Sequence, residues 1–194
     1  MATIPCFSTP IWCIKPENHQ AINEELLSYI NGVLLNNRVP AEENSSAVGG
    51  YQSQKFDFSA THLFSTALNK TTSQVSKELM IDPKCKTMVT DCWANINSPG
   101  SYNRKHTHAN SMLSGVYYPS VPDNSGQIVF TDPRIQAYVI RLPTTQKTAF
   151  TSRQIKRTPS AGEFILFPSW LEHSVEINRS EKERVSVAFN IFFD

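Results

Sequence analysis

The second half of the chain alternates between apolar and polar side chains, and this period of two limits the folds that the chain can adopt. From Lys86 onward, short runs rich in β-branched and aromatic residues are separated by Gly, Pro, Asn and Ser. Such runs are typical of β-strands, and the residues between them are typical of turns. Many short strands at regular spacing predict a β-sandwich or barrel. The expected strands are 87–97, 111–118, 127–132, 163–168 and 184–193, with a hairpin or excursion formed by 137–142 and 148–155.

The first part of the chain is expected to form helices that support the sheet. We predict a short strand within 4–14, broken by proline, a helix from about 16 to 36 and a second helix from about 60 to 80. Apolar residues at helical spacing would face the sheet. They are Ile22, Leu26, Ile30 and Val33 in the first helix, and Phe64, Leu68, Val75 and Leu79 in the second. The polar stretch 37–55, which contains Gly49-Gly50, is expected to be a loop, either a connector or a lid.

The length and the charge balance exclude several classes of protein. The 194 residues suit a single domain, which divides into a helical support region (1–86) and a β core (87–194). With 18 basic and 17 acidic residues, the net charge of +1 favours no nucleic-acid partner. No apolar run approaches the length of a bilayer span, and the N-terminus does not resemble a signal peptide. The four cysteines lack zinc-finger spacing, so we expect reduced thiols and a cytoplasmic location.

Three of the five histidines form the most informative pattern. His106 and His108 flank Thr107, and His173 lies far downstream. On a β-strand, residues i and i+2 point to the same face, so the first two imidazoles could aim at one point. A third imidazole from another strand would complete a facial set of metal ligands. Open facial sites of this kind host non-haem Fe(II) oxygenases, although their usual set is two histidines and one carboxylate.

Two motifs and their order give the chain a family resemblance. Leu113-Ser114-Gly115-Val116-Tyr117-Tyr118 precedes Phe167-Pro168-Ser169-Trp170-Leu171-x-His173, and Arg184 opens the last apolar strand. Together with the His-x-His, this order resembles the Fe(II)/2-oxoglutarate-dependent dioxygenase superfamily over about residues 87–193. The prolyl-hydroxylase-like members and a family of small oxygenases of bacteria and phages are similar in pattern. The resemblance implies a mainly β fold with supporting helices, built on a double-stranded β-helix (jelly-roll) core.

The resemblance also implies a ligand set. The superfamily motif is His-x-Asp/Glu, a distal His and then a basic residue, and the matching positions are His106, His108, His173 and Arg184. His108 stands where the carboxylate is expected. Neutral imidazole is a good ligand for Fe(II). Three alternatives therefore stay open: His108 is the ligand, a carboxylate from Asp132 or Asp123 takes its place, or water completes a site of two histidines.

Further residues are candidates for the cosubstrate pocket. Arg184 offers a rigid fork suited to the distal carboxylate of 2-oxoglutarate. By resemblance, Ser114, Tyr118 and Val175 would line the same pocket. Asn95 and Asn190 lie in otherwise bulky strands and could face the metal, while Trp93 and Trp170 are expected in the core. The alternative to a cosubstrate role for Arg184 is a surface salt bridge with 181–183.

The predicted function is that of an Fe(II)- and 2-oxoglutarate-dependent dioxygenase that uses O2 and forms succinate and CO2. Its substrate would be a peptidyl or amino-acid side chain, or a small molecule. The alternatives are a three-histidine iron dioxygenase that needs no 2-oxoglutarate, and a non-catalytic module that binds metal inertly. A homodimer could form through the final strand. If the chain is encoded by a phage, its compartment would be the host cytoplasm.

Overall fold

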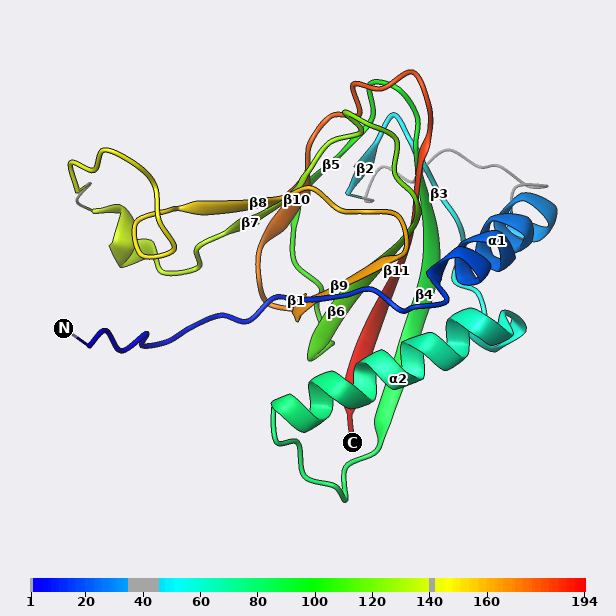
Figure 1. The fold of residues 1–194 in the computed structure, drawn as a ribbon, viewed down its shortest axis with the longest axis horizontal. Helices are drawn as coiled ribbons and strands as arrows, with labels where there is room; N and C mark the ends of the chain where they lie inside the picture. Colours follow the sequence, from blue (N-terminus) through cyan, green and yellow to red (C-terminus); the bar gives the residue numbers. More distant parts are fainter. Residues whose placement is uncertain (1, 35–45, 140–141) are drawn as a thin grey trace.

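Two antiparallel sheets face each other in the computed structural model, which describes residues 2–34, 46–139 and 142–194 (Figure 1). The six-stranded sheet has the order β1-β9-β6-β11-β4-β3, and the five-stranded sheet has the order β2-β5-β10-β7-β8. Strands that are far apart in the sequence are neighbours in each sheet, such as β1 and β9 in the larger sheet and β5 and β10 in the smaller one. This arrangement confirms a mainly β fold, and it places a space between the sheets that both of them line.

The bounds of the elements are as follows. The larger sheet contains β1 (Trp12–Ile14), β3 (Tyr51–Gln52), β4 (Thr87–Asn97), β6 (Leu113–Ser120), β9 (Glu163–Pro168) and β11 (Arg184–Phe193). The smaller sheet contains β2 (Ala47–Val48), β5 (Tyr102–His106), β7 (Ile128–Thr131), β8 (Gln154–Arg157) and β10 (His173–Val175). The helices are α1 (His19–Tyr29), which continues as a π-helix (Ile30–Leu34), and α2 (His62–Glu78), with short 3-10 turns at Phe58–Ala60 and Ile135–Tyr138.

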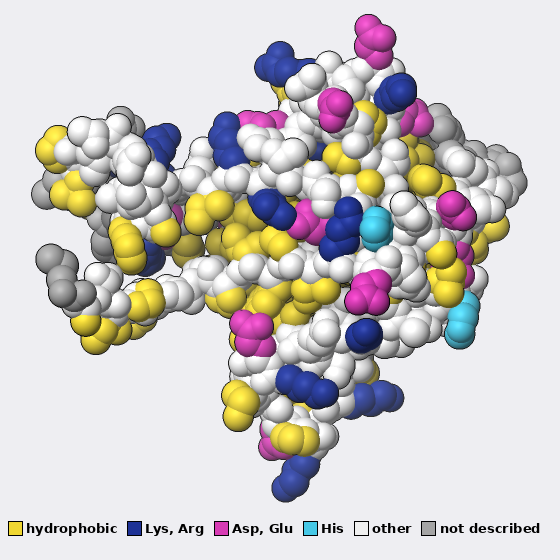
Figure 2. All heavy atoms as spheres, in the orientation of Figure 1, with side chains coloured by type: hydrophobic (Ala, Val, Ile, Leu, Met, Phe, Trp, Pro, Cys, Tyr) yellow, Lys and Arg dark blue, Asp and Glu magenta, His cyan; other side chains and the backbone are white. Residues whose placement is uncertain are grey.

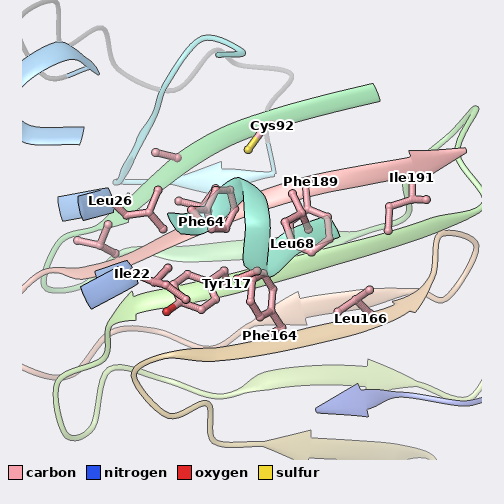
Figure 3. Packing of buried hydrophobic residues seen from close by; sticks show 14 of the residues in the cluster. Ile22, Leu26, Phe64, Leu68, Cys92, Tyr117, Phe164, Leu166, Phe189 and Ile191 are labelled. Carbon is pink, nitrogen blue, oxygen red and sulfur yellow. The ribbon is translucent and has the colours of Figure 1, made fainter. Parts of the chain in front are cut away.

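The larger sheet separates two environments. On β4 and β11, every second residue points toward the helices, and the residues between them point into the space between the sheets. The helix-facing set packs against buried apolar residues of α1 and α2 (Figure 3). It includes Cys92, Ala94, Ile96, Val187, Phe189 and Ile191. The helices therefore hold one face of the sheet, which leaves the opposite face for a site.

Most of the apolar residues predicted to face the sheet from the two helices are buried, but the last residue of each set is not. Ile22, Leu26 and Ile30 are buried, whereas Val33 is 57% exposed. The chain widens into a π-helix from Ile30, which shifts the following residues around the axis and off the apolar face. Leu79 lies beyond the end of α2 and is 37% exposed.

The stretch expected as a loop contains two short strands. β2 pairs with β5 and β3 pairs with β4, so 47–52 crosses from one sheet to the other at their edges. Gly50 makes the crossing possible, because a Cβ there would lie 2.8 Å from the carbonyl oxygen of Ile96. The described part of this stretch is thus held by sheet pairing and is not a free lid. The remainder, at 37–45, lies outside the described residues.

Of the hairpin or excursion predicted for 137–142 and 148–155, the hairpin is wrong and the segment is an excursion. The described chain forms a 3-10 turn at Ile135–Tyr138, and the strand that pairs with β7 is β8, which begins at Gln154 instead of at about 148. This segment projects away from the sheets (Figure 1), and apolar side chains lie at its surface (Figure 2). Ile135, Val139, Leu142 and Phe150 are between 67% and 79% exposed. Their apolar pattern suggested a strand, but the projecting segment has no core face against which they can be buried.

The final strand is central in its sheet. β11 pairs with β4 along its whole length and with β6 from Val185 to Ile191. Both edges of that stretch are occupied, so the expected route to a homodimer through this strand is closed there. The homodimer itself stays a prediction. In the described part of the chain, no helix combines the length and apolar character that crossing a membrane requires.

Gly115 on β6 makes room for the core. It lies between Phe189 of β11 and Leu166 of β9, and a Cβ at this position would enter the Phe189 ring and lie 3.0 Å from Leu166 Cγ. We expect Gly115→Ala to lower the free energy of unfolding by about 1–3 kcal/mol, because a well-packed core does not accommodate an extra methyl group without strain. Thermal or urea unfolding measures this loss. Gly32→Ala is the control, because no atom of the described residues lies within 4 Å of the new Cβ. Equal melting temperatures for the two variants would contradict the expectation.

Candidate active site

The three histidines named from the sequence meet at one end of the space between the sheets. His106 is the last residue of β5 and His173 is the first residue of β10, and the two are direct partners in the antiparallel pairing. One ligand atom from each of His106, His108 and His173 lies within 4.8 Å of the others. Among the described residues, this is the group that could hold a metal ion.

The position of His108 differs from the one that strand geometry predicts. It does not share a strand with His106, because β5 ends at His106 and His108 lies in the following turn. The backbone N–H of His108 donates to the Ser169 carbonyl at 3.0 Å, which ties this turn to the segment after β9. The two imidazoles therefore converge through a tertiary contact and not through strand alternation.

Hydrogen bonds to backbone carbonyls orient two of the rings. His106 Nδ1 lies 2.7 Å from the Arg104 carbonyl oxygen, and His173 Nδ1 lies 2.9 Å from that of Leu171. A carbonyl only accepts, so each Nδ1 carries the proton and each Nε2 keeps its lone pair for a metal. Carbonyl partners of this kind are the usual support of metal-bound histidines.

Burial keeps the three rings neutral. It lowers the pKa of His173 to about 3 and that of His108 to about 4, in both cases assisted by repulsion from His106. Burial also lowers the pKa of His106. Neutral imidazole is the form that ligates metals, so the cluster is ready to bind a cation near pH 7.

Neither carboxylate alternative joins this cluster. Asp132 accepts two hydrogen bonds from the Arg134 guanidinium, at 2.9 and 2.8 Å, and faces a separate pocket beside the N-terminal segment. Asp123 is exposed in the loop between β6 and β7. The sequence left these two open because it does not show which strand end lies next to the histidines.

A cavity of about 580 Å³ opens beside the histidines, and both sheets line it. Of the candidates from the sequence, Tyr118, Val175, Arg184 and Asn95 line it together with the three histidines. Its wall also includes Trp93, Asn103, Val116, Ile128, Ser186 and Ala188. Its lining, as far as the structure describes the chain, contains no Asp or Glu, whereas Arg104, Lys105 and Arg184 contribute to it. A cavity with cations and no carboxylate in its lining favours anionic ligands.

Arg184 is the most unusual of these residues, because it is 1% exposed. Its Nη2 donates to Asn97 Oδ1 at 2.7 Å and its Nη1 donates to the Ser125 carbonyl at 3.1 Å. Its Nε is buried and has no hydrogen-bond partner among the described residues. The alternative of a surface salt bridge is wrong. A buried guanidinium with an unused donor fits the carboxylate of a ligand, and neutral imidazoles fit iron, so the residues present suit both groups.

Ser114 and Asn190 lie behind the histidines and are not part of the cavity lining. Ser114 Oγ donates to Asn190 Oδ1 at 2.8 Å and lies 2.8 Å from Ser169 Oγ. The Asn190 side chain interacts with His108 and raises the pKa of that ring against the effect of burial. These two residues therefore support the turn that carries His108.

The prediction that Trp93 and Trp170 lie in the core is wrong for both, and Trp93 is a residue of the candidate site. Trp170 is 55% exposed. Trp93 lines the cavity, and its ring stacks on that of His108 with centroids 5.8 Å apart. Asn97, the partner of Arg184, is absent from the site residues predicted above. The period of two on β4 places Trp93, Asn95 and Asn97 on one face, so the pattern that indicated Asn95 also indicates Trp93 and Asn97.

The family follows from the same stretch of chain. Residues 91–190, which are 100 of the 194, match the model of a family described as "Putative 2OG-Fe(II) oxygenase". The chain belongs to this family. It is therefore a 2-oxoglutarate-dependent Fe(II) oxygenase, with Fe(II) as cofactor and 2-oxoglutarate and O2 as cosubstrates. No match was found among curated protein sequences.

Solved structures of low sequence identity share the fold. A Pseudomonas putida prolyl-4-hydroxylase is 17% identical, with 95% of this chain and 92% of that chain covered and a TM-score of 0.63. A Trichoplax adhaerens prolyl hydroxylase in complex with a hypoxia inducible factor peptide is 14% identical, covering 95% and 84%, with a TM-score of 0.64. HygX from Streptomyces hygroscopicus, with nickel and 2-oxoglutarate bound, is 12% identical, covering 94% and 82%, with a TM-score of 0.61. The jelly-roll core expected from the sequence is thereby confirmed.

Proposed function

We propose that His106, His108 and His173 hold Fe(II), that Arg184 binds the distal carboxylate of 2-oxoglutarate, and that the enzyme hydroxylates its substrate. The observation that carries the proposal is the buried Arg184 guanidinium, which lacks a carboxylate partner among the described residues and lines the same cavity as the three neutral histidines. In this reaction, 2-oxoglutarate loses CO2 and becomes succinate. One oxygen atom of O2 enters the succinate and the other enters the hydroxyl group of the product.

Each part of the cavity has a distinct task in this proposal. Bound iron and 2-oxoglutarate would supply the activation of O2. The three histidines approach from one side and leave the remaining coordination positions to ligands. Val116, Ile128 and Val175 add apolar wall and limit the water around the cosubstrate.

Tyr118 is the second candidate donor to the cosubstrate. It is 2% exposed and lines the cavity with Arg184, whose charge acts on its hydroxyl group. Burial raises the pKa of Tyr118 to about 12, against the lowering effect of Arg184. The phenol therefore keeps its proton near pH 7 and can donate a hydrogen bond to a carboxylate.

The structural neighbours support the proposed class of substrate. Prolyl hydroxylases are among them, and one of these is in complex with a peptide. A peptidyl or amino-acid side chain is therefore the substrate that we propose. All four cysteines are free thiols, which fits the predicted cytoplasmic location.

The test is an anaerobic titration of Fe(II)-loaded protein with 2-oxoglutarate, followed by visible absorption. We expect a metal-to-ligand charge-transfer band that saturates with the cosubstrate. Zn(II)-loaded protein is the control, because a d10 ion gives no such band. Iron binding without the band, together with O2 consumption on a substrate alone, would favour a three-histidine dioxygenase. If the protein binds no iron, the non-catalytic module is the alternative that remains.

A further inference from the structure

Asn97 is the direct cross-strand partner of Arg184. It is the last residue of β4, Arg184 is the first residue of β11, and the two are paired in the sheet register. Opposed residues of antiparallel strands have neighbouring side chains. Asn97 is 1% exposed, and its Oδ1 accepts the 2.7 Å bond from Arg184 Nη2. The contact is therefore buried on both sides.

The orientation of the Asn97 amide is determined by a second hydrogen bond. Its Nδ2 donates to Asn103 Oδ1 at 3.1 Å, and Asn103 Nδ2 donates to Ser46 Oγ at 3.2 Å. The backbone carbonyl of Asn97 accepts a bond of 2.8 Å from Asn178 Nδ2. With the amide nitrogen occupied by Asn103, the amide oxygen has to face the guanidinium. Side chains from β4 and β5 thus fix the position of Arg184.

The partners of Arg184 hold it without neutralising it. A buried arginine is normally compensated by a carboxylate, because an isolated charge in the interior is costly. Here both acceptors among the described residues are neutral, the amide oxygen of Asn97 and the carbonyl oxygen of Ser125. Aspartate has nearly the shape of asparagine and would accept the same bond, but it would also cancel the charge. The neutral amide leaves that charge available to a ligand.

We propose that Asn97 is a positioning residue that presents Arg184 to the cosubstrate with its charge uncompensated, and thereby makes the cavity select 2-oxo acids whose far end is anionic. The inference rests on the proposed function, since it takes Arg184 as the group that binds the distal carboxylate. Asn97 itself does not need to touch the ligand. Its contribution is the combination of a fixed hydrogen bond and zero charge.

The experiment compares two ligands in wild type and in Asn97→Asp. Zn(II)-loaded protein is titrated calorimetrically with 2-oxoglutarate and with 2-oxoglutaramate, whose far end is a neutral amide. We expect Asn97→Asp to raise the Kd for 2-oxoglutarate at least about tenfold, because the new carboxylate competes for Arg184. The Kd for 2-oxoglutaramate should change by less than about threefold, since no ion pair is lost. Asn97→Asp keeps the hydrogen bond to Arg184 but loses the one that Asn97 Nδ2 donates to Asn103 Oδ1, so circular dichroism is used to verify that the variant is folded.

Two further variants separate the proposal from simpler explanations. Asn95 lines the cavity two residues before Asn97 on the same strand, so Asn95→Asp adds the same charge without the bond to Arg184 and is expected to weaken 2-oxoglutarate binding less. Asn97→Ser keeps a neutral acceptor, so it should retain the preference for 2-oxoglutarate over 2-oxoglutaramate even if both bind more weakly. If Asn97→Asp fails to fold, the same comparison of the two ligands in Asn97→Ser tests the proposal.

The outcomes distinguish this inference from the proposed function. If wild-type protein binds no 2-oxoglutarate, the proposed function fails. If wild type binds it, and Asn97→Asp binds it equally well or loses no more affinity than Asn95→Asp, the inference is overturned while the proposed function stands. Asn97→Ser adds no charge, so a loss of 2-oxoglutarate affinity in this variant as large as that in Asn97→Asp would also overturn the inference.

Discussion

Replacing His173 by alanine is expected to abolish iron binding and, with it, all 2-oxoglutarate turnover. His173 is 3% exposed, and its ring lies between those of His106 and Phe167, with centroid distances of 4.3 and 4.5 Å. Alanine removes one of three ligand atoms from a site that has no carboxylate to replace it. Loss of a supporting residue already costs about 10–100-fold in metal affinity, so loss of a ligand should cost at least about 100-fold.

The measurement is an anaerobic Fe(II) titration with circular dichroism to verify folding. His62→Ala is the matched control, because His62 is an exposed histidine at the start of α2, outside the cluster. It should bind iron as the wild type does. If His173→Ala is folded and still binds one equivalent of iron with unchanged affinity, the assignment of the three histidines as the metal site fails.

Replacing Arg184 by methionine is expected to remove 2-oxoglutarate binding while iron binding persists. Methionine fills much of the same volume without the charge, so the variant separates electrostatics from packing. Truncating one side of a buried charge pair costs about 2–5 kcal/mol, which corresponds to a rise in the Kd for 2-oxoglutarate of roughly 30-fold to several thousandfold.

The stability of this variant is also informative. In the ligand-free protein, Arg184 is a buried charge whose hydrogen-bond acceptors among the described residues are neutral, and its replacement leaves Asn97 Oδ1 without that donor. Removing the buried charge stabilises the protein, whereas leaving Asn97 Oδ1 without its donor destabilises it. The melting temperature should therefore change far less than the affinity for 2-oxoglutarate. Arg134→Met, which alters a cation beside a different pocket, is the control. Full 2-oxoglutarate affinity in Arg184→Met would remove Arg184 from the cosubstrate site.

Long strands with a clear period of two could be predicted from the sequence. β4, β9 and β11 have the predicted bounds, because their apolar residues are numerous enough to define both the element and its buried face. β5 and β10 could not be predicted in this way. β5 reads Tyr-Asn-Arg-Lys-His and β10 has three residues, so neither has an apolar pattern of its own. Pairing with neighbouring strands places them in the sheet, and no local signal reports that pairing.

The residue types of the site were evident in the sequence, and their partners were not. Three histidines and a late arginine identify iron and a carboxylate as ligands, because few other side chains suit those groups. Whether a nearby residue is a ligand, a support or a bystander depends on contacts between distant segments. Ser114 supports His108 through Asn190, 76 residues away, and Asp132 is engaged by Arg134.

The β core, its helical support and the residue types of the proposed centre could be predicted from the amino-acid sequence, since they depend on periodicity and on the intrinsic properties of side chains. The assembly of the centre depends on tertiary contacts. These contacts bring His108 to the other two histidines through the Ser169 carbonyl, turn Trp93 into the cavity and set a neutral amide against Arg184. Burial and hydrogen bonding between strands far apart in the chain determine whether a charge is cancelled or kept available for a ligand, and no local pattern reports them.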